Sequence, residues 1–591
     1  MVAVGLGLVT AQALFRAWAI YPSWFYTDDY RLLYDATSSD LDLSYLTSPF
    51  DSQFMPIGRL IVWVVAHSGT LNWPLAASIT LALQVVAALA CLWMLVVLFG
   101  ARWGIVPLLL VYLTSALTMP AFMWWAAALN QMLLQTVFFG AVGAGVAWLR
   151  DRRRTQLALL VGLLVLGLLT YVKTLLLAPL LAALTLGWFT TGPWHERLLD
   201  AVRRYWVALA LGAVLVSGYL AYYLLEVPQP FEQESDGEAL DLAWHMVGTT
   251  FLTGVFGGPW RWAVENPPVA TVNPPGWAHA LAGVAALAVV LASIMFRHRA
   301  LRAWVLLFGY LAALWLLVLT SRAAVIGPMI GLEPRYLTDA VCAVVLCIGL
   351  AFLPVRGATE PSALRDGPSR CWLATPHRVA VGALTGVVTV LGVASSASYA
   401  HVWHTDHPGA DYVQQLDSDL SRVGTVHLAD TVVPQAVIPG YSHPYNTTRR
   451  LAPLVDPDVR FPDATGELAV VDTDGTLSLP RLDGSVSSPP GPQPNCGWPI
   501  RDGRPTTIPL ASDVFELDLW MRIDYLASGN TTVRVRTGAA TTEASVNRGL
   551  DSLYVRTEGG FGQIEVTTVD ASTALCVGAV EVGTIAPGEG L

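Results

Sequence analysis

The chain has 591 residues, of which 54% are hydrophobic and only 13% are charged. Soluble domains carry roughly a quarter of charged residues, so this composition excludes an ordinary soluble protein and indicates a polytopic membrane protein. The formal net charge is −10, and no run of Lys and Arg has the density typical of a nucleic-acid site. Nucleic acid is therefore not an expected partner.

Apolar stretches that suit membrane spans fill the chain as far as residue 399. A span needs about 17 to 25 apolar residues, and counting on this basis predicts about eleven transmembrane helices. They lie approximately at 1–20, 74–99, 105–117, 126–149, 157–171, 175–189, 207–225, 277–296, 305–319, 340–353 and 380–399. The segment 57–68 is too short and too charged to cross, so we expect an interfacial helix there.

Basic residues predict the orientation, because Lys and Arg are enriched in cytoplasmic loops. Arginines gather in alternate loops, most densely at Arg150, Arg152, Arg153 and Arg154. With these loops inside and an odd number of spans, the N-terminus is cytoplasmic and the chain from residue 400 is extracytoplasmic. The use of Ala, Gly, Val and Arg with a single lysine, Lys173, hints at a GC-rich bacterial genome and favours a bacterial plasma membrane.

The polar remainder divides into two expected parts. Residues 400–494 mix helical and strand patterns and end in a Pro/Ser/Gly-rich linker. Residues 495–591 alternate polar and apolar residues between turn signals, which predicts an antiparallel, jelly-roll-like β-sandwich. Such a domain either binds carbohydrate or forms a structural cap, and the sequence does not choose between them. The spans, at 1–399, form the first of three expected domains.

Two cysteines fall in this outer part, near the ends of the sandwich. In an oxidising compartment Cys496 and Cys576 are expected to form a disulfide. Spacings typical of structural zinc, such as CxxC or HExxH, are absent from the sequence, so a divalent metal is possible but not indicated.

Ionisable residues mark the predicted outer ends of the spans. An ionised side chain costs roughly 2.5–3.5 kcal/mol at a helix centre and less near the interface, so these residues are candidates for function. A carboxylate can act as a general base, and Arg or Lys can hold a phosphate leaving group. The candidates are Asp28, Asp29, Arg59, Lys173, Arg322, Glu333, Arg335 and Tyr336.

Each candidate also has a structural interpretation. The acid pair can cap a helix, Lys173 and Arg322 can anchor spans at the interface, and Arg335 can pair with Glu333 only to fix a loop. Trp124 and Trp125 suit an aromatic belt better than a platform for sugar.

The first span followed by "DDY", an amphipathic helix in the first outer loop, about eleven spans and an outer C-terminal domain resemble the GT-C glycosyltransferases. The similar branch contains protein O-mannosyltransferases, the aminoarabinose transferase of lipid A and actinobacterial arabinosyltransferases. The resemblance covers roughly residues 1–399. Members take a sugar from a polyprenyl phosphate, invert its anomeric centre, and carry their signature acid at the start of the first outer loop.

The resemblance implies that Asp28 or Asp29, with Asp28 slightly favoured, deprotonates the acceptor hydroxyl. It implies that Arg335 and Tyr336, with Lys173 and Arg322, hold the donor phosphate. Contacts to the acceptor or the surrounding loops then fall to Arg59, Trp124, Trp125 and Glu333.

Several relatives carry a further acid in the second outer loop, but this chain has "TMPAFMWWAAALNQ" there, so a metal requirement stays open. The sugar, the acceptor and the oligomeric state are not fixed either. Two other classes compete with the enzyme: a lipid-linked glycan transporter, for which the expected midplane charges and repeats are missing, and a non-catalytic envelope scaffold that binds glycan.

Overall fold

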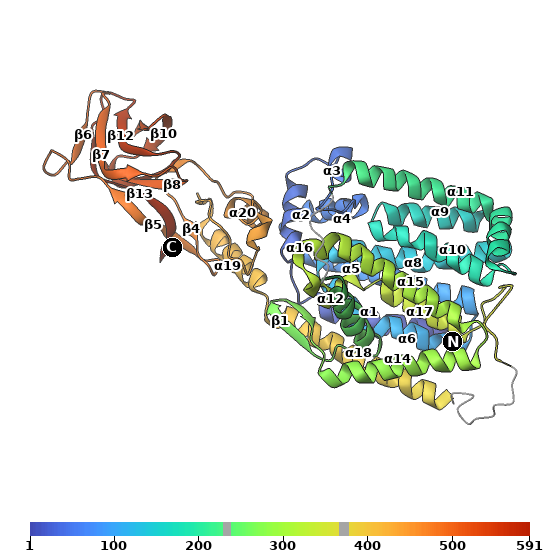
Figure 1. Ribbon diagram of the computed structural model, residues 1–591. Helices are drawn as coiled ribbons and strands as arrows, with labels where there is room; N and C mark the ends of the chain where they lie inside the picture. The colour runs from blue at the N-terminus through green and yellow to red at the C-terminus, as the bar shows by residue number, and fades with distance from the viewer. Residues whose placement is uncertain (229–237, 366–377) are drawn as a thin grey trace. The chain divides into compact units, whose positions relative to one another are not determined.

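The computed structural model describes residues 1–228, 238–365 and 378–591. They form two compact units, Met1–His407 and Pro408–Leu591. The first is an α-helical bundle and the second is rich in β-strands (Figure 1). The predicted fold class, a polytopic α-helical membrane protein with a C-terminal β domain, is confirmed.

The predicted spans are all helical, but they differ in length. Seven belong to helices long and apolar enough to cross a membrane: α1 (Val2–Ile20), α5 (Trp73–Phe99), α8 (Trp125–Asp151), α11 (Trp194–Glu226), α14 (Gly276–Phe296), α15 (Ala300–Val318) and α18 (Arg378–Thr405). An eighth is a pair bent by 44°, made of η1 (Trp103–Ile105) with α6 (Val106–Thr114), then η2 (Ala116–Thr118) with α7 (Met119–Met123).

Three predicted spans are shorter helices: α9 (Arg154–Leu168), α10 (Leu177–Trp188), which follows η3 (Val172–Leu176), and α17 (Ala340–Phe352). At 1.5 Å per residue, the 13 residues of α17 reach only about 20 Å. This is less than the hydrocarbon thickness of about 30 Å, so α17 does not cross a bilayer alone.

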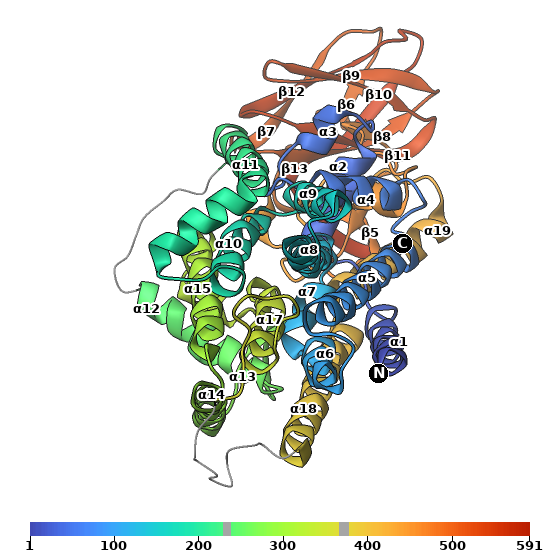
Figure 2. The ribbon, with the colours of Figure 1, turned by 90° about the vertical axis from the view of Figure 1, so that its right-hand side faces the viewer.

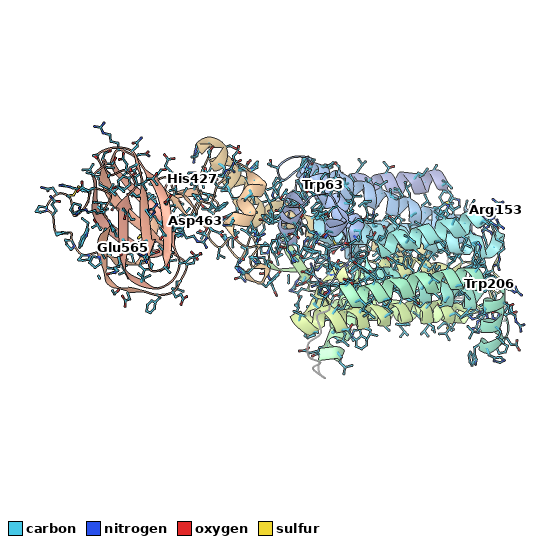
Figure 3. The ribbon with its side chains drawn as sticks, turned by 90° about the horizontal axis from the view of Figure 1, so that it is seen from above. Trp63, Arg153, Trp206, His427, Asp463 and Glu565 are labelled. Carbon is cyan, nitrogen blue, oxygen red and sulfur yellow. A yellow bond between two sulfur atoms is a disulfide. The ribbon has the colours of Figure 1, made fainter. Side chains whose placement is uncertain are left out.

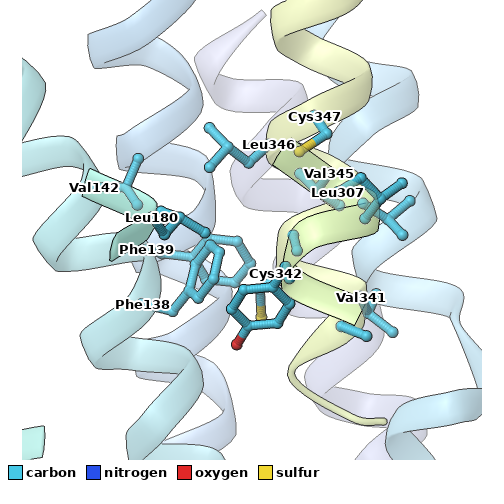
Figure 4. Packing of buried hydrophobic residues seen from close by; sticks show 14 of the residues in the cluster. Phe138, Phe139, Val142, Leu180, Leu307, Val341, Cys342, Val345, Leu346 and Cys347 are labelled. Carbon is cyan, nitrogen blue, oxygen red and sulfur yellow. The ribbon is translucent and has the colours of Figure 1, made fainter. Parts of the chain in front are cut away.

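The bundle is built around α8, which is buried along most of its length. Viewed along the bundle, α8 is surrounded by α5, α9, α10 and α17 (Figure 2). Phe138 and Phe139 of α8 pack in one hydrophobic cluster with Val341 and Cys342 of α17 (Figure 4). These central helices therefore form a packed scaffold, and the segments at their ends are available for function.

Short elements gather at one end of this bundle. The segment between α1 and α5 forms α2 (Asp28–Thr37), α3 (Leu43–Thr47) and α4 (Pro56–Ala66), and α4 matches the helix expected at 57–68. The same end carries α16 (Ala324–Ile326) (Figure 1). Around it the chain forms α12 (Glu238–Ala243), η4 (Trp244–Phe251), α13 (Leu252–Val255), β1 (Trp262–Asn266), β2 (Val269–Val272), η5 (Leu319–Ala323), η6 (Pro328–Leu332) and η7 (Pro334–Tyr336).

The second unit begins with α19 (Pro408–Val423), η8 (Gly440–Ser442) and α20 (Thr448–Val455) and continues as two antiparallel sheets. One sheet has the order β10-β9-β12-β7, and the other β3-β11-β8-β13-β5-β4, with β6 paired to β13. The strands are β3 (Ala464–Thr465), β4 (Val470–Val471), β5 (Leu477–Ser487), β6 (Trp498–Ile500), β7 (Thr506–Val514), β8 (Leu519–Ala527), β9 (Thr531–Thr537), β10 (Ala540–Val546), β11 (Gly549–Thr557), β12 (Phe561–Thr568) and β13 (Leu575–Gly590).

The two sheets share a hydrophobic core, to which Met521, Ile564 and Val577 contribute. Because β5 pairs along β13, the division expected at residue 494 lies inside one compact unit. A disulfide joins Cys496 to Cys576, and so fastens the segment that connects β5 and β6 to β13.

Candidate active site

The paired acids lie where α2 begins, after the short turn that follows α1. Both occupy the first turn of α2, where the partial positive charge of a helix N-terminus favours a carboxylate. The two side chains nevertheless have different surroundings.

Asp29 is fully buried and both of its carboxylate oxygens accept hydrogen bonds. Oδ2 accepts from the backbone N–H of Tyr26, and Oδ1 from that of Ala126, each at 2.8 Å. Ala126 is the second residue of α8. Burial raises the pKa of Asp29 well above its usual value, although both hydrogen bonds act against this rise. Asp29 therefore joins the start of α2 to the start of α8.

Asp28 is only partly buried. Its pKa is raised, first by burial and then by the negative charge of Asp51, while Arg335, Arg322 and Arg31 act in the opposite direction. Within the described ranges, no group is placed to donate a hydrogen bond to its carboxylate. Asp28 is thus a residue that is not fully buried, and three guanidinium groups act electrostatically on its carboxylate.

Arg335 lies in η7, on an aromatic surface. Its guanidinium carbon is 4.1 Å from the ring centroid of Trp124 and 5.0 Å from that of Tyr336, which is within the range of cation–π attraction. Its Nε is 2.5 Å from Oε2 of Glu333. The structure therefore brings four of the candidate residues together with Asp28.

Arg31 and Arg322 both contact Asp51, which is not among the candidates predicted from the sequence. Nη1 of Arg31 is 2.9 Å from Oδ1 of Asp51, and Nη2 of Arg322 is 3.9 Å from Oδ2. Arg31 follows Asp28 by three residues on α2, and this spacing puts both on one helix face. Arg31 could therefore have been predicted from the sequence as a neighbour of Asp28. Asp51 lies in a short turn closed by Phe50 and Gln53, and no local sequence pattern marks it.

Lys173 occupies a buried network behind η7. Its Nζ donates to the carbonyl of Tyr336 at 2.7 Å and to Asp339 at 2.8 Å, and Tyr310 donates its hydroxyl to the other oxygen of Asp339 at 2.7 Å. The Lys173 side chain is only 3% exposed. These contacts suit a residue that holds the loop better than one that contacts a donor.

Two other candidates are engaged in packing. Arg59 is buried and donates to the backbone carbonyls of Ser48 and Pro49. Trp125 is fully buried, with its ring 5.3 Å from that of Phe25. Arg59 therefore contacts the loop between α3 and α4, and Trp125 packs in the interior.

In the parts of the chain that the structure describes, no three His, Cys, Asp or Glu side chains are grouped as a metal site requires. The second unit has a shallow depression of about 360 Å³ on its four-stranded sheet, lined by Arg534, Arg536, Ala539, Thr541, Glu565 and Thr567. Figure 3 marks Glu565 on this sheet.

No family model matches the sequence, and no curated protein matches it. Among solved structures, the chain is similar to ArnT from Cupriavidus metallidurans bound to undecaprenyl phosphate, with 13% identity and a TM-score of 0.42 over 77% of this chain and 89% of ArnT. It is also similar to the arabinofuranosyltransferase AftD from Mycobacteria, with 12% identity and a TM-score of 0.34 over 99% of this chain and 58% of AftD. The chain thus spans less than two thirds of AftD. Both kinds of enzyme are among those that the sequence resembles.

Proposed function

We propose that the protein is an inverting glycosyltransferase of the outer face of a bacterial plasma membrane. It moves a sugar from a polyprenyl-phosphate donor to an envelope glycan, a glycolipid or a protein. The observation that carries the proposal is the partly buried residue Asp28, whose carboxylate is under the electrostatic influence of Arg335, Arg322 and Arg31. The donor class is taken from the sequence resemblance.

In this reaction Asp28 accepts the proton of the acceptor hydroxyl as its oxygen attacks the anomeric carbon. The bond between that carbon and the phosphate oxygen breaks, and its electron pair leaves with the polyprenyl phosphate. A carboxylate with a raised pKa is a stronger base than an ordinary aspartate. Guanidinium groups stabilise the charge that develops on the phosphate, and Arg335 is held for this purpose by Trp124 and Glu333.

The test compares cells that carry wild type, Asp28→Asn or Asp29→Asn at matched expression. Envelope glycans and polyprenyl-phosphate sugars are extracted and profiled. We expect Asp28→Asn to accumulate one donor and to lose one glycan linkage, which would identify the sugar as well. If Asp28→Asn gave the same profile as wild type, the result would contradict the proposed glycosyltransferase activity and favour a non-catalytic scaffold that binds glycan.

A second candidate function is glycan binding by the sandwich. The depression on the four-stranded sheet presents two guanidinium groups and one carboxylate, which can donate to and accept from sugar hydroxyls. Arg536 and Glu565 face each other across β9 and β12. We expect Arg536→Ala and Glu565→Ala in the full chain to weaken binding to isolated envelope polysaccharide, whereas Arg481→Ala on β5 leaves binding unchanged. Equal binding by wild type and the three variants would exclude this depression as the glycan-binding site.

A further inference from the structure

Asp51 has no part in the reaction proposed above, yet its carboxylate lies between two of the three arginines near Asp28. Arg31 comes from α2 and Arg322 from η5, so two distant segments present positive charge to one small anion. Two guanidinium groups that converge on a shared oxyanion also form a typical phosphate-binding arrangement.

We propose that Asp51 is a displaceable counter-ion, which occupies the phosphate position between Arg31 and Arg322 until the polyprenyl-phosphate donor replaces it. The inference rests on the proposed function, and it adds that a side chain of the protein occupies the phosphate position when the donor is absent.

The ion pairs of Asp51 are suited to exchange. The side chains of Asp51, Arg31 and Arg322 remain 34%, 30% and 29% exposed, and solvated ion pairs contribute little to stability. A phosphate offers more acceptor oxygens to the two guanidinium groups than one carboxylate does. Replacement therefore strengthens the contacts of both arginines.

The loop allows this exchange without unfolding. Phe50 and Gln53 exchange two backbone hydrogen bonds of 2.9 Å, so Asp51 lies at the tip of a closed turn. Arg59 fixes the carbonyls of Ser48 and Pro49 just before this turn. Rotation of the Asp51 side chain at the tip takes its carboxylate away from both guanidinium groups, while Arg31 stays over the ring of Phe50, 4.7 Å from its centroid.

The backbone of Asp51 has φ = +50°, a conformation that Asn and Gly also adopt readily. The substitution Asp51→Asn thus removes the charge and keeps the turn. Asp40→Asn is the matched control, because Asp40 is an exposed acid of the same segment with no ion pair in the structure as described.

The experiment measures binding of a short-chain polyprenyl monophosphate to the purified full chain in detergent. We expect Asp51→Asn to bind about three- to tenfold more tightly than wild type, Asp40→Asn to bind as wild type does, and Asp51→Gly to repeat the gain. Equal or weaker binding by both Asp51 variants would overturn the inference, as would the same gain in Asp40→Asn. If neither wild type nor variants bound the lipid, the proposed donor would fail together with this inference.

A second readout is the pH dependence of transfer. Asp28 is faced by Asp51, Asp29, Arg31, Arg322 and Arg335. Removing the charge of Asp51 lowers the pKa of Asp28 in the donor-free protein, so the acidic limb of the kcat/KM profile for the donor, which reports the free enzyme, should move to lower pH in Asp51→Asn and stay in place in Asp40→Asn. An unmoved limb of kcat/KM would show that Asp51 does not act on Asp28 in the donor-free site and would overturn the inference.

Discussion

Asp28 and Asp29 are chemically identical neighbours that the structure separates by environment. Both oxygens of Asp29 accept backbone hydrogen bonds inside the bundle, whereas Asp28 faces a cluster of arginines. The sequence predicts both as candidate bases, with Asp28 slightly favoured. It does not reveal their different surroundings, since the donor of one of these bonds, Ala126, lies 97 residues away.

This difference predicts that replacing Asp by Asn lowers stability at position 29 and activity at position 28. An Asn at position 29 can accept only one of the two hydrogen bonds, and a buried N–H left unpaired costs about 1–3 kcal/mol. We expect Asp29→Asn to lower the thermal unfolding midpoint of the purified chain, and Asp28→Asn to unfold like wild type while losing transfer activity. A stable Asp29→Asn protein would show that its carboxylate is not structural.

The raised pKa of Asp28 predicts a pH dependence. A general base works only when deprotonated, so activity should rise with pH through a value above that of an ordinary aspartate, near 3.9. Arg31 acts to lower this pKa, and Arg31→Gln should move the acidic limb of kcat to higher pH at saturating donor. Arg102→Gln, at an exposed loop position, serves as control. A limb that moved to lower pH would contradict the assignment of Asp28.

At the scale of elements, the 3₁₀ turn η7 is held from behind by two side chains. Gln131 of α8 donates to the carbonyl of Arg335 at 3.1 Å, and Lys173 donates to that of Tyr336. The family resemblance implies that Lys173 helps to hold the donor phosphate, and a cation at a span end also suits an interfacial anchor. Its carboxylate partner, Asp339, lies 166 residues further along the chain, and no local pattern reveals such a pair.

This arrangement predicts a non-additive pair of substitutions. Breaking a buried ion pair from one side leaves an uncompensated charge, which costs about 3–5 kcal/mol, whereas replacing both partners by apolar residues is often close to neutral. Lys173→Met should therefore destabilise the protein more than Lys173→Met combined with Asp339→Leu.

Thermal unfolding in detergent measures this difference, and the double variant should recover most of the lost midpoint. Additive losses would mean that the two side chains contribute independently. Donor binding by the double variant provides the control for Lys173 as a phosphate ligand, because a true ligand would not be rescued by changing Asp339.

At the scale of the whole molecule, apolar composition predicted where helices form but not how far they reach. The stretch 340–353 has the apolarity of a span, yet α17 contains only 13 residues and is packed inside the bundle. Hydropathy reports burial in lipid and burial in protein alike. The strands were easier to predict, because a sheet with one face on the core needs apolar and polar residues in alternation along each strand. The burial of β9 alternates in this way.

The last prediction concerns orientation, on which the proposed outer-face reaction depends. Asp40 and Arg153 are both exposed, and Figure 3 shows Arg153 at the end of the bundle opposite Trp63 of α4. The positive-inside rule puts Arg153 in the cytoplasm. Asp40, between α2 and α4, is then outside.

Cysteine labelling tests this placement in intact cells. Cys91, Cys342 and Cys347 are buried and Cys496 is bonded to Cys576, and Cys371, outside the described residues, is replaced by serine. A membrane-impermeant maleimide should label Asp40→Cys in intact cells and Arg153→Cys only after permeabilisation. The reverse result would put Asp28 in the cytoplasm, where an extracytoplasmic acceptor could not reach it, and would contradict the proposed reaction.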